Sequence, residues 1–214
     1  MKRMDILDIH THHSVPQPEG VISLRLYKEN IDVKPEGKQR YSVGIHPWDT
    51  EIEIDEERLK LLDKIATQPE IVAIGETGVD INIGGPLFRQ MQMFKHHIEL
   101  SERLGKPLII HDVKAHDMVV AARKDLNPKQ NWAIHGFRQK PEVADMLLRT
   151  GCYLSFGPQF NPDTLKEMPE DRILAETDDS EETIENVIER ISEVRGKDMR
   201  AIITANTKKF LAKQ

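Results

Sequence analysis

The stretch Asp8-Ile9-His10-Thr11-His12 ends the first apolar run of the chain, and the expected fold follows from it. In a β-strand, side chains two residues apart point to the same side, so the imidazoles of His10 and His12 can reach one metal ion. Asp8 shares this side and lies further back along the strand. Two histidines at this spacing are typical of a metal site, whereas the alternative is a pair of solvated histidines in a loop.

Further potential metal ligands stand at the downstream ends of later apolar runs. Each is a single histidine or carboxylate, and the set is Glu76, His111, His135 and Asp178. In a (β/α)8 barrel every strand delivers its last residues to the same mouth, so groups far apart in the sequence meet there. The pattern therefore predicts an α/β protein with a distorted TIM-type (β/α)8 barrel and with metal ligands on its rim.

Apolar or β-branched runs alternate with helical patterns along most of the chain. One helical apolar stripe with steps of three and four residues runs from Leu87 to Ile98, and another runs from Ile184 to Val194. Nothing marks a repeat or a second domain, so one barrel domain over residues 1–214 is expected. The roughly eight expected strands are Met4–His10, Val21–Tyr27, Tyr41–His46, Ile71–Gly75, Pro107–His111, Trp132–His135, Cys152–Phe156 and Arg172–Glu176.

The early connections differ from the later ones. The segment from His13 to Gly20 contains Pro16 and Pro18, and the segment from Lys28 to Arg40 has no helical apolar period. Neither predicts a packed crossover helix, so the first helix of the barrel is expected to be missing. Parallel neighbours need a connection of ~12 residues or more, whereas antiparallel neighbours accept a short turn. The second strand, Val21–Tyr27, is therefore expected to run antiparallel to its neighbours.

Composition sets outer limits on the protein. The chain has 214 residues, enough for one core but fewer than the ~250 usual for a complete barrel. The single cysteine, Cys152, has no internal disulfide partner, and Asp5 and Asp8 interrupt the apolar start before a signal-peptide core could develop, so a cytoplasmic protein is expected. No apolar run approaches the ~18 residues that span a bilayer, so no membrane partner is expected. A net charge of -6 argues against a broad basic surface for duplex nucleic acid.

The types of ligand indicate how these residues would be divided between two metal ions. Glu76 ends a buried strand, and its carboxylate has two oxygens that can bridge two ions, although a lone acid there could merely cap a loop. His111 and His135 end apolar strands at equivalent positions and would hold the second ion, whereas a single such histidine is more often a core residue. Asp178 would bind the first ion and act as the catalytic base that takes a proton from metal-bound water.

Several motifs stand in a fixed order along the chain. They are Asp8 with His10-Thr-His12, Gly44-Ile-His46-Pro47, Gly75-Glu76-Thr-Gly78-Val-Asp80, His111, His135-Gly-Phe137, Glu176-Thr-Asp178 and Asn206 before Phe210. This series resembles the TatD-related deoxyribonucleases, metal-dependent hydrolases of the amidohydrolase superfamily, and the resemblance covers almost the whole chain. It implies that one ion is held by His10, His12, Glu76 and Asp178, that a second is held by Glu76, His111 and His135, and that His46 faces the substrate.

The chain departs from that family at positions expected to contact the substrate. The family usually has an arginine two residues after the fifth-strand histidine, and this chain has Val113 followed by Lys114. Arg138-Gln139-Lys140 replaces the usual small residues after His135, and it either restores positive charge near the mouth or forms a solvated turn. We expect His46, Lys114 and Arg138 to bind the substrate. Trp48 on a rim loop either packs under that loop or stacks on a base.

The predicted site points to phosphodiester chemistry. Two carboxylates and two divalent ions leave the site about two units positive, which attracts a phosphodiester. The number of imidazoles favours zinc or another transition ion, and magnesium or manganese is the alternative. The expected function is that of a metal-dependent hydrolase, a phosphodiesterase or deoxyribonuclease of TatD type. Its expected substrate is single-stranded or nicked DNA or another phosphodiester, and no protein partner is inferred.

Other interpretations remain open at this point. The stretch His10-Thr-His12-His13-Ser14 also resembles the opening motif of the polymerase and histidinol phosphatase family, which implies a trinuclear phosphomonoesterase. The segments Gly75–Gly78 and Glu176–Asp178 favour the first resemblance. The missing arginine at Val113 also allows a metal-binding protein with little or no catalytic activity, acting as a scaffold or regulator. An amide or lactone hydrolase on the same metal frame is a further alternative.

Overall fold

Eight parallel strands close into a barrel in the computed structural model, which describes residues 5–13, 15, 17–27 and 39–213. The strands are β1 (Asp8–Thr11), β2 (Gly20–Arg25), β3 (Arg40–Gly44), β4 (Ile71–Asp80), β5 (Leu108–Val113), β6 (Trp132–Ile134), β7 (Tyr153–Phe156) and β8 (Ile173–Ala175). Each strand pairs with the next, and β8 pairs back onto β1. Each of the predicted runs overlaps one strand, so the expected TIM-type barrel of the α/β class is confirmed.

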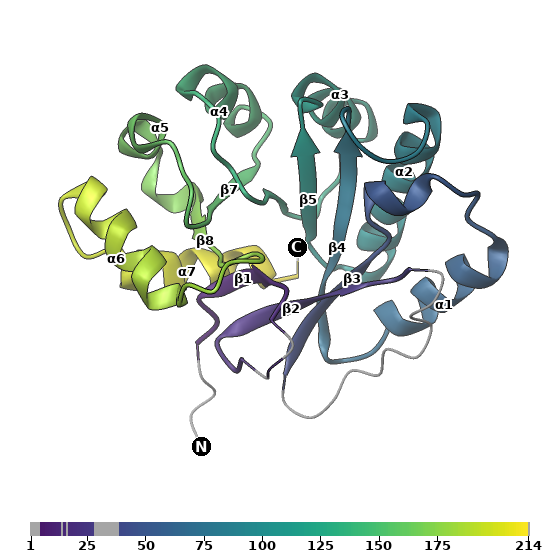
Figure 1. Cartoon of the computed structure of the whole chain (residues 1–214), viewed down its shortest axis with the longest axis horizontal. Helices are drawn as coiled ribbons and strands as arrows, with labels where there is room; N and C mark the ends of the chain where they lie inside the picture. The colour runs from purple at the N-terminus through teal and green to yellow at the C-terminus, as the bar shows by residue number, and fades with distance from the viewer. Residues whose placement is uncertain (1–4, 14, 16, 28–38, 214) are drawn as a thin grey trace.

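Helices follow most of the later strands and surround the barrel (Figure 1). They are α1 (Glu56–Ala66), α2 (Leu87–Leu104), α3 (His116–Leu126), α4 (Pro141–Leu148), α5 (Pro162–Glu167), α6 (Ile184–Arg195) and α7 (Arg200–Leu211), with the 3-10 turns η1 (Pro47–Thr50) and η2 (Glu170–Arg172). The two predicted apolar stripes lie in α2 and α6. Among the helices that the structure describes, none has the length and apolar character to cross a membrane.

The expectation of an antiparallel second strand is wrong, because β2 runs parallel to both β1 and β3. The described residues between β1 and β2 contain no helix, as predicted, and the connection does not need one. Since β1 has 4 residues, the chain must travel back only ~13 Å, a distance that a connection of this length can span without a helix. The prediction for the connection from β2 to β3 falls mostly on residues 28–38, outside the described residues.

A buried apolar cluster draws side chains from seven strands and from α7, an arrangement that only the barrel interior allows. Phe210 of α7 packs against Tyr153, with ring centroids 5.7 Å apart. Tyr153 is the first residue of β7, so Phe210 covers the amino end of the barrel and leaves the carboxyl end open for the site. The cluster consists of Ile9, Val21, Ala73, Ile109, Ala133, Tyr153, Leu174 and Phe210.

Candidate metal centre

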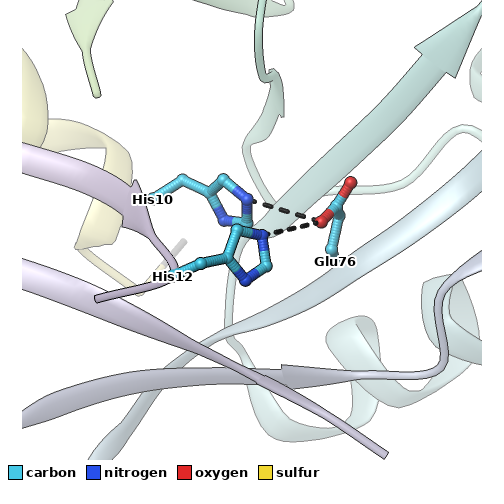
Figure 2. Close-up of side chains that lie close together, drawn as sticks. All are labelled: His10, His12 and Glu76. Atoms are coloured by element: carbon cyan, nitrogen blue, oxygen red, sulfur yellow. Dashed lines mark ion pairs between the residues drawn. The ribbon is translucent and has the colours of Figure 1, made fainter. Parts of the chain in front are cut away.

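Four of the predicted ligands meet at the carboxyl end of the barrel. The Nε2 atom of His10 is 3.4 Å from Oε2 of Glu76 and 3.6 Å from Oδ1 of Asp178. The Nε2 atom of His12 lies 3.6 Å from each of the same two oxygens. Figure 2 shows both imidazoles of β1 and its extension pointing at the carboxylate of Glu76 from β4. Two nitrogens and two oxygens from three separate segments therefore surround one point.

Neighbouring ligand atoms of an ion with metal–ligand bonds of ~2.1 Å in tetrahedral geometry lie ~3.4 Å apart. Four of the six distances among these atoms are close to that spacing, at 3.4–3.6 Å. The Nε2 atom of His10 is buried and has no hydrogen-bond partner among the described residues, and a metal ion would satisfy it. Burial opposes a charge on His10, but the carboxylates of Asp178 and Glu76 outweigh burial and raise the pKa of His10 to about 9. Protons and a metal ion would therefore compete for this nitrogen.

A second set of donors gathers around the other oxygen of Glu76. Its Oε1 atom lies 2.7 Å from Nδ1 of His111 and 2.7 Å from Nε2 of His135. The two histidine nitrogens are 3.3 Å apart, so the three atoms are close enough to share one ion. The two oxygens of Glu76 thus face different pairs of histidines, which is the arrangement expected of a bridging carboxylate. The structure brings all six predicted ligands together, and their binding of metal stays a prediction.

The local backbone explains how Glu76 reaches this place. The pairing of β4 with β5 shifts register between Ile74 and Thr77, and such an irregularity redirects a side chain on the strand. Gly75 and Gly78 on either side have φ of 138° and 139°, values that residues with a Cβ rarely adopt. A Cβ at Gly78 would also lie 2.1 Å from the carbonyl oxygen of His111. The Gly-Glu-Thr-Gly sequence therefore permits close contact between β4 and β5 at the site.

Asp178 is held in place by main-chain contacts with the end of β1. Its N–H donates to the carbonyl of His10 at 3.0 Å, and its own carbonyl accepts from the N–H of His12 at 2.9 Å. Its φ of 55° is left-handed, a conformation that costs energy in residues other than glycine and that recurs at functional sites. Burial raises the pKa of its carboxyl group, but His10 and His135 outweigh burial and lower that pKa to about 2. Asp178 is therefore ionised at neutral pH.

Three further carboxylates stand behind the predicted ligands. Oδ2 of Asp80 is 3.2 Å from Nε2 of His111, and Oε1 of Glu176 is 3.5 Å from Nδ1 of His135. Such partners orient ligand histidines and make them better donors. Asp8 instead accepts from the main-chain N–H of His10 at 3.1 Å, and burial raises its pKa to about 7. Sequence reasoning assigned no role to Asp80 or Glu176, although both lie in the motifs that contain Glu76 and Asp178.

His46 lies against Glu76 in a fixed orientation. Its Nδ1 accepts the main-chain N–H of Trp48 at 3.1 Å, so the proton of the neutral ring resides on Nε2. That Nε2–H donates to Oε1 of Glu76 at 2.9 Å, and burial lowers the pKa of His46 and keeps it neutral. His46 therefore positions the shared carboxylate in this structure, and its contact with a substrate stays a prediction.

The two predicted cationic residues lie on exposed loops of the rim. Nζ of Lys114 is 3.3 Å from Oδ1 of Asn82, and Nη1 of Arg138 is 3.2 Å from Oε1 of Gln159. Each thus joins its loop to a neighbouring loop, and neither contacts the metal donors. Arg25, at the end of β2, is a third rim cation that sequence reasoning missed, because no motif precedes it.

Comparison with known proteins agrees with this geometry. A family model described as TatD related DNase matches residues 22–212. The uncharacterized metal-dependent hydrolase YabD of Bacillus subtilis is 33% identical over 146 residues, which cover 64% of this chain and 57% of YabD. The uncharacterized metal-dependent hydrolase YcfH of Escherichia coli is 32% identical over 148 residues, covering 64% of this chain and 54% of YcfH. The chain thus aligns with little more than half the length of these curated relatives.

Solved structures share the fold over nearly the whole chain. The crystal structure of YjjV, a TatD homolog from Escherichia coli, superposes with a TM-score of 0.78 at 19% identity, over 96% of this chain and 97% of that chain. A TatD family hydrolase from Entamoeba histolytica superposes with a TM-score of 0.75 at 13% identity and the same coverage. These two likenesses concern the fold alone, whereas the family model spans most of the sequence. The chain therefore belongs to the TatD-related DNase family.

Proposed function

We propose that this protein is a metal-dependent hydrolase that cleaves phosphodiesters, with single-stranded or nicked DNA as the leading substrate class. The observation that carries the proposal is the position of Glu76, whose Oε2 faces His10 and His12 while its Oε1 faces His111 and His135. The family model, described as a DNase, supports the choice of a phosphodiester over other esters.

The charges of the site favour an anionic substrate. Glu76 and Asp178 contribute two negative charges, and neutral imidazoles contribute none. Two divalent ions would therefore leave the site about two units positive in a protein whose net charge is -6. When bound, such ions would supply an activated water and offset charge on the phosphoryl oxygens. A phosphate would be attracted locally, without a broad basic surface.

The exposure of the ligands sets the side from which a substrate enters. The side chains of Glu76 and His135 are 6% and 8% exposed, whereas those of His12 and Asp178 are 35% and 30% exposed. A phosphate would therefore approach over His12 and Asp178. Asp178 is ionised and sits at this open edge, so its carboxylate is the group placed to accept a proton from the attacking water.

The donor set bears on the choice of metal. Four imidazoles and two carboxylates suit zinc or another transition ion better than magnesium, which prefers oxygen ligands and retains its waters. We therefore propose that the two sites hold zinc or a similar transition ion. Magnesium or manganese is the alternative that metal analysis of the purified protein would detect.

The test combines metal analysis with a substrate panel. The purified protein would be analysed for metals and then assayed on bis-p-nitrophenyl phosphate, p-nitrophenyl phosphate and single-stranded DNA, with Asp178→Asn assayed alongside. We expect two ions per chain and faster hydrolysis of the diester than of the monoester. Faster hydrolysis of the monoester would favour a phosphatase of the polymerase and histidinol phosphatase type. Bound metal without turnover of any phosphoester would favour a metal-binding scaffold, and either result would overturn the proposal.

A further inference from the structure

Trp48 is a partly exposed aromatic side chain that the fold holds rigidly beside the metal donors. Its side chain is 39% exposed, whereas the other tryptophan, Trp132, is fully buried. The main-chain N–H of Trp48 donates to Nδ1 of His46 at 3.1 Å, and its indole Nε1–H donates to Oδ2 of Asp80 at 2.7 Å. One hydrogen bond fixes the main chain and the other fixes the indole, so the exposed ring loses little further freedom when it binds a ligand.

The indole lies next to the residues that surround Glu76. Its ring centroid is 4.7 Å from that of His46 and 5.8 Å from that of His111. Arg25 also holds the η1 turn, because its Nε and Nη2 each donate to Asp49 at 2.6 Å. The guanidinium carbon of Arg25 also lies 5.6 Å from the Trp48 ring centroid, within the range of a cation–π contact. Trp48 is thus the aromatic surface at the edge of the predicted reaction site.

The loop after β4 extends this surface. Oδ1 of Asp80 accepts the main-chain N–H groups of Asn82 and Ile83 at 2.8 and 3.1 Å, so one carboxylate fixes both this loop and the indole of Trp48. Ile81 and Ile83 are 53% and 51% exposed. The rim at β3 and β4 thus carries the exposed apolar side chains of Trp48, Ile81 and Ile83. Lys114 donates to Oδ1 of Asn82 in the same loop, so a cation lies beside this apolar surface.

We propose that Trp48 is a specificity-determining residue that stacks on the base of a nucleotide whose phosphate occupies the metal site. This inference rests on the proposed phosphodiesterase function and narrows its substrate to esters that carry a nucleobase. Stacking on an aromatic side chain accepts any base, because every base has a π-face. The exposed isoleucines after Asp80 would cover the edge of the stacked base.

The test measures binding rather than turnover. Zinc-loaded protein would be titrated in a calorimeter with thymidine 5′-monophosphate and with 2-deoxyribose 5-phosphate, which has the same sugar and phosphate but no base. The wild type should bind the nucleotide ~5- to 150-fold more tightly than the sugar phosphate. Trp48→Leu should bring the two dissociation constants within ~2-fold of each other. Trp48→Phe, which keeps an aromatic face but lacks the Nε1–H donor, should retain at least a ~5-fold preference.

A control and a kinetic measurement separate stacking from a structural role. Phe88→Leu removes another exposed aromatic ring, near the start of α2, and should leave the wild-type preference unchanged. In Trp48→Leu, KM for thymidine 5′-(4-nitrophenyl phosphate) should rise by the factor by which the binding preference for the nucleotide over the sugar phosphate falls. KM for methyl 4-nitrophenyl phosphate should stay within ~2-fold.

Three results would overturn the inference. They are an equal affinity of the wild type for both ligands, an unchanged preference in Trp48→Leu, and a loss of preference in Trp48→Phe as large as in Trp48→Leu. The last result would mean that the hydrogen bond to Asp80 matters and the aromatic face does not. Because binding is measured without turnover, a protein that prefers the nucleotide but hydrolyses no phosphodiester would refute the proposed function and leave the role of Trp48 standing.

Discussion

Replacement of Glu76 by glutamine tests whether one carboxylate serves two ions. Glutamine keeps the size of the side chain, but only one of its two terminal atoms, the oxygen, has a lone pair to donate to a metal ion. In the structure, Oε2 faces His10 and His12 at 3.4 and 3.6 Å, while Oε1 faces His111 and His135 at 2.7 Å each. The amide oxygen can therefore serve one pair of histidines only. We expect the variant to bind at most one ion per chain where the wild type binds two.

The size of the effect follows from ligand number and charge. With two ions, the wild-type site has a charge of +4 from the metals and −2 from Glu76 and Asp178, which leaves +2, and the variant would have +3. Loss of a partner behind a ligand weakens metal binding ~10- to 100-fold, so loss of a direct ligand should exceed ~100-fold at the weaker site. The second ion should therefore be absent at zinc concentrations that saturate the wild type.

The assay is metal analysis after dialysis against buffer with a fixed free zinc concentration. Circular dichroism would confirm that the variant is folded. Glu99→Gln, which removes one charge from the exposed surface of α2, should retain two ions and serves as the matched control. Two ions per chain in Glu76→Gln, bound with the affinity of the wild type, would refute the reasoning.

Three more changes test separate parts of the structure. Asp178→Asn should retain at least one ion and lose turnover of bis-p-nitrophenyl phosphate by roughly 100- to 10,000-fold, and full activity would exclude Asp178 as the base. Asp80→Asn removes the carboxylate facing Nε2 of His111, so zinc titration should show one of two sites weakened by ~10- to 100-fold, whereas equal weakening of both sites would contradict its role. Burial lowers the pKa of His97 to about 4, and its Nε2 accepts the N–H of Ile45. Between pH ~6.5 and pH ~4 the histidine is therefore protonated in the unfolded chain but neutral in the folded chain. The free energy of unfolding, measured by urea melts, should therefore be highest above pH ~6.5 and fall by up to ~3 kcal/mol toward pH ~4. The same fall in His97→Gln would exclude His97 as its cause.

The ligands at strand ends were predictable because each follows a local pattern. His10 and His12 share one side of a strand end, and His111 and His135 each close or follow a short apolar run. Parallel strands of a closed barrel bring such positions to one mouth, so the gathering of the ligands follows from the strand pattern alone. The structure agrees, since every predicted ligand lies within 3.6 Å of at least one other.

Other features depend on distances that no local pattern encodes. The direction of β2 depends on how far the chain must return. Because β1 is short, a connection without a helix suffices, which the rule for crossover connections excluded. The hydrogen bond between Trp48 and Asp80 and the bidentate contact between Arg25 and Asp49 join segments 32 and 24 residues apart. Such contacts follow from the closure of the barrel, so the aromatic side of the rim could be described only from the folded chain.

Anomalous diffraction from crystals of the zinc-loaded protein tests the shared-carboxylate site most directly. We predict two anomalous peaks ~3.5–4 Å apart with the Glu76 carboxylate between them, one beside His10 and His12 and the other beside His111 and His135. A single peak, or two peaks that do not share Glu76, would contradict the account.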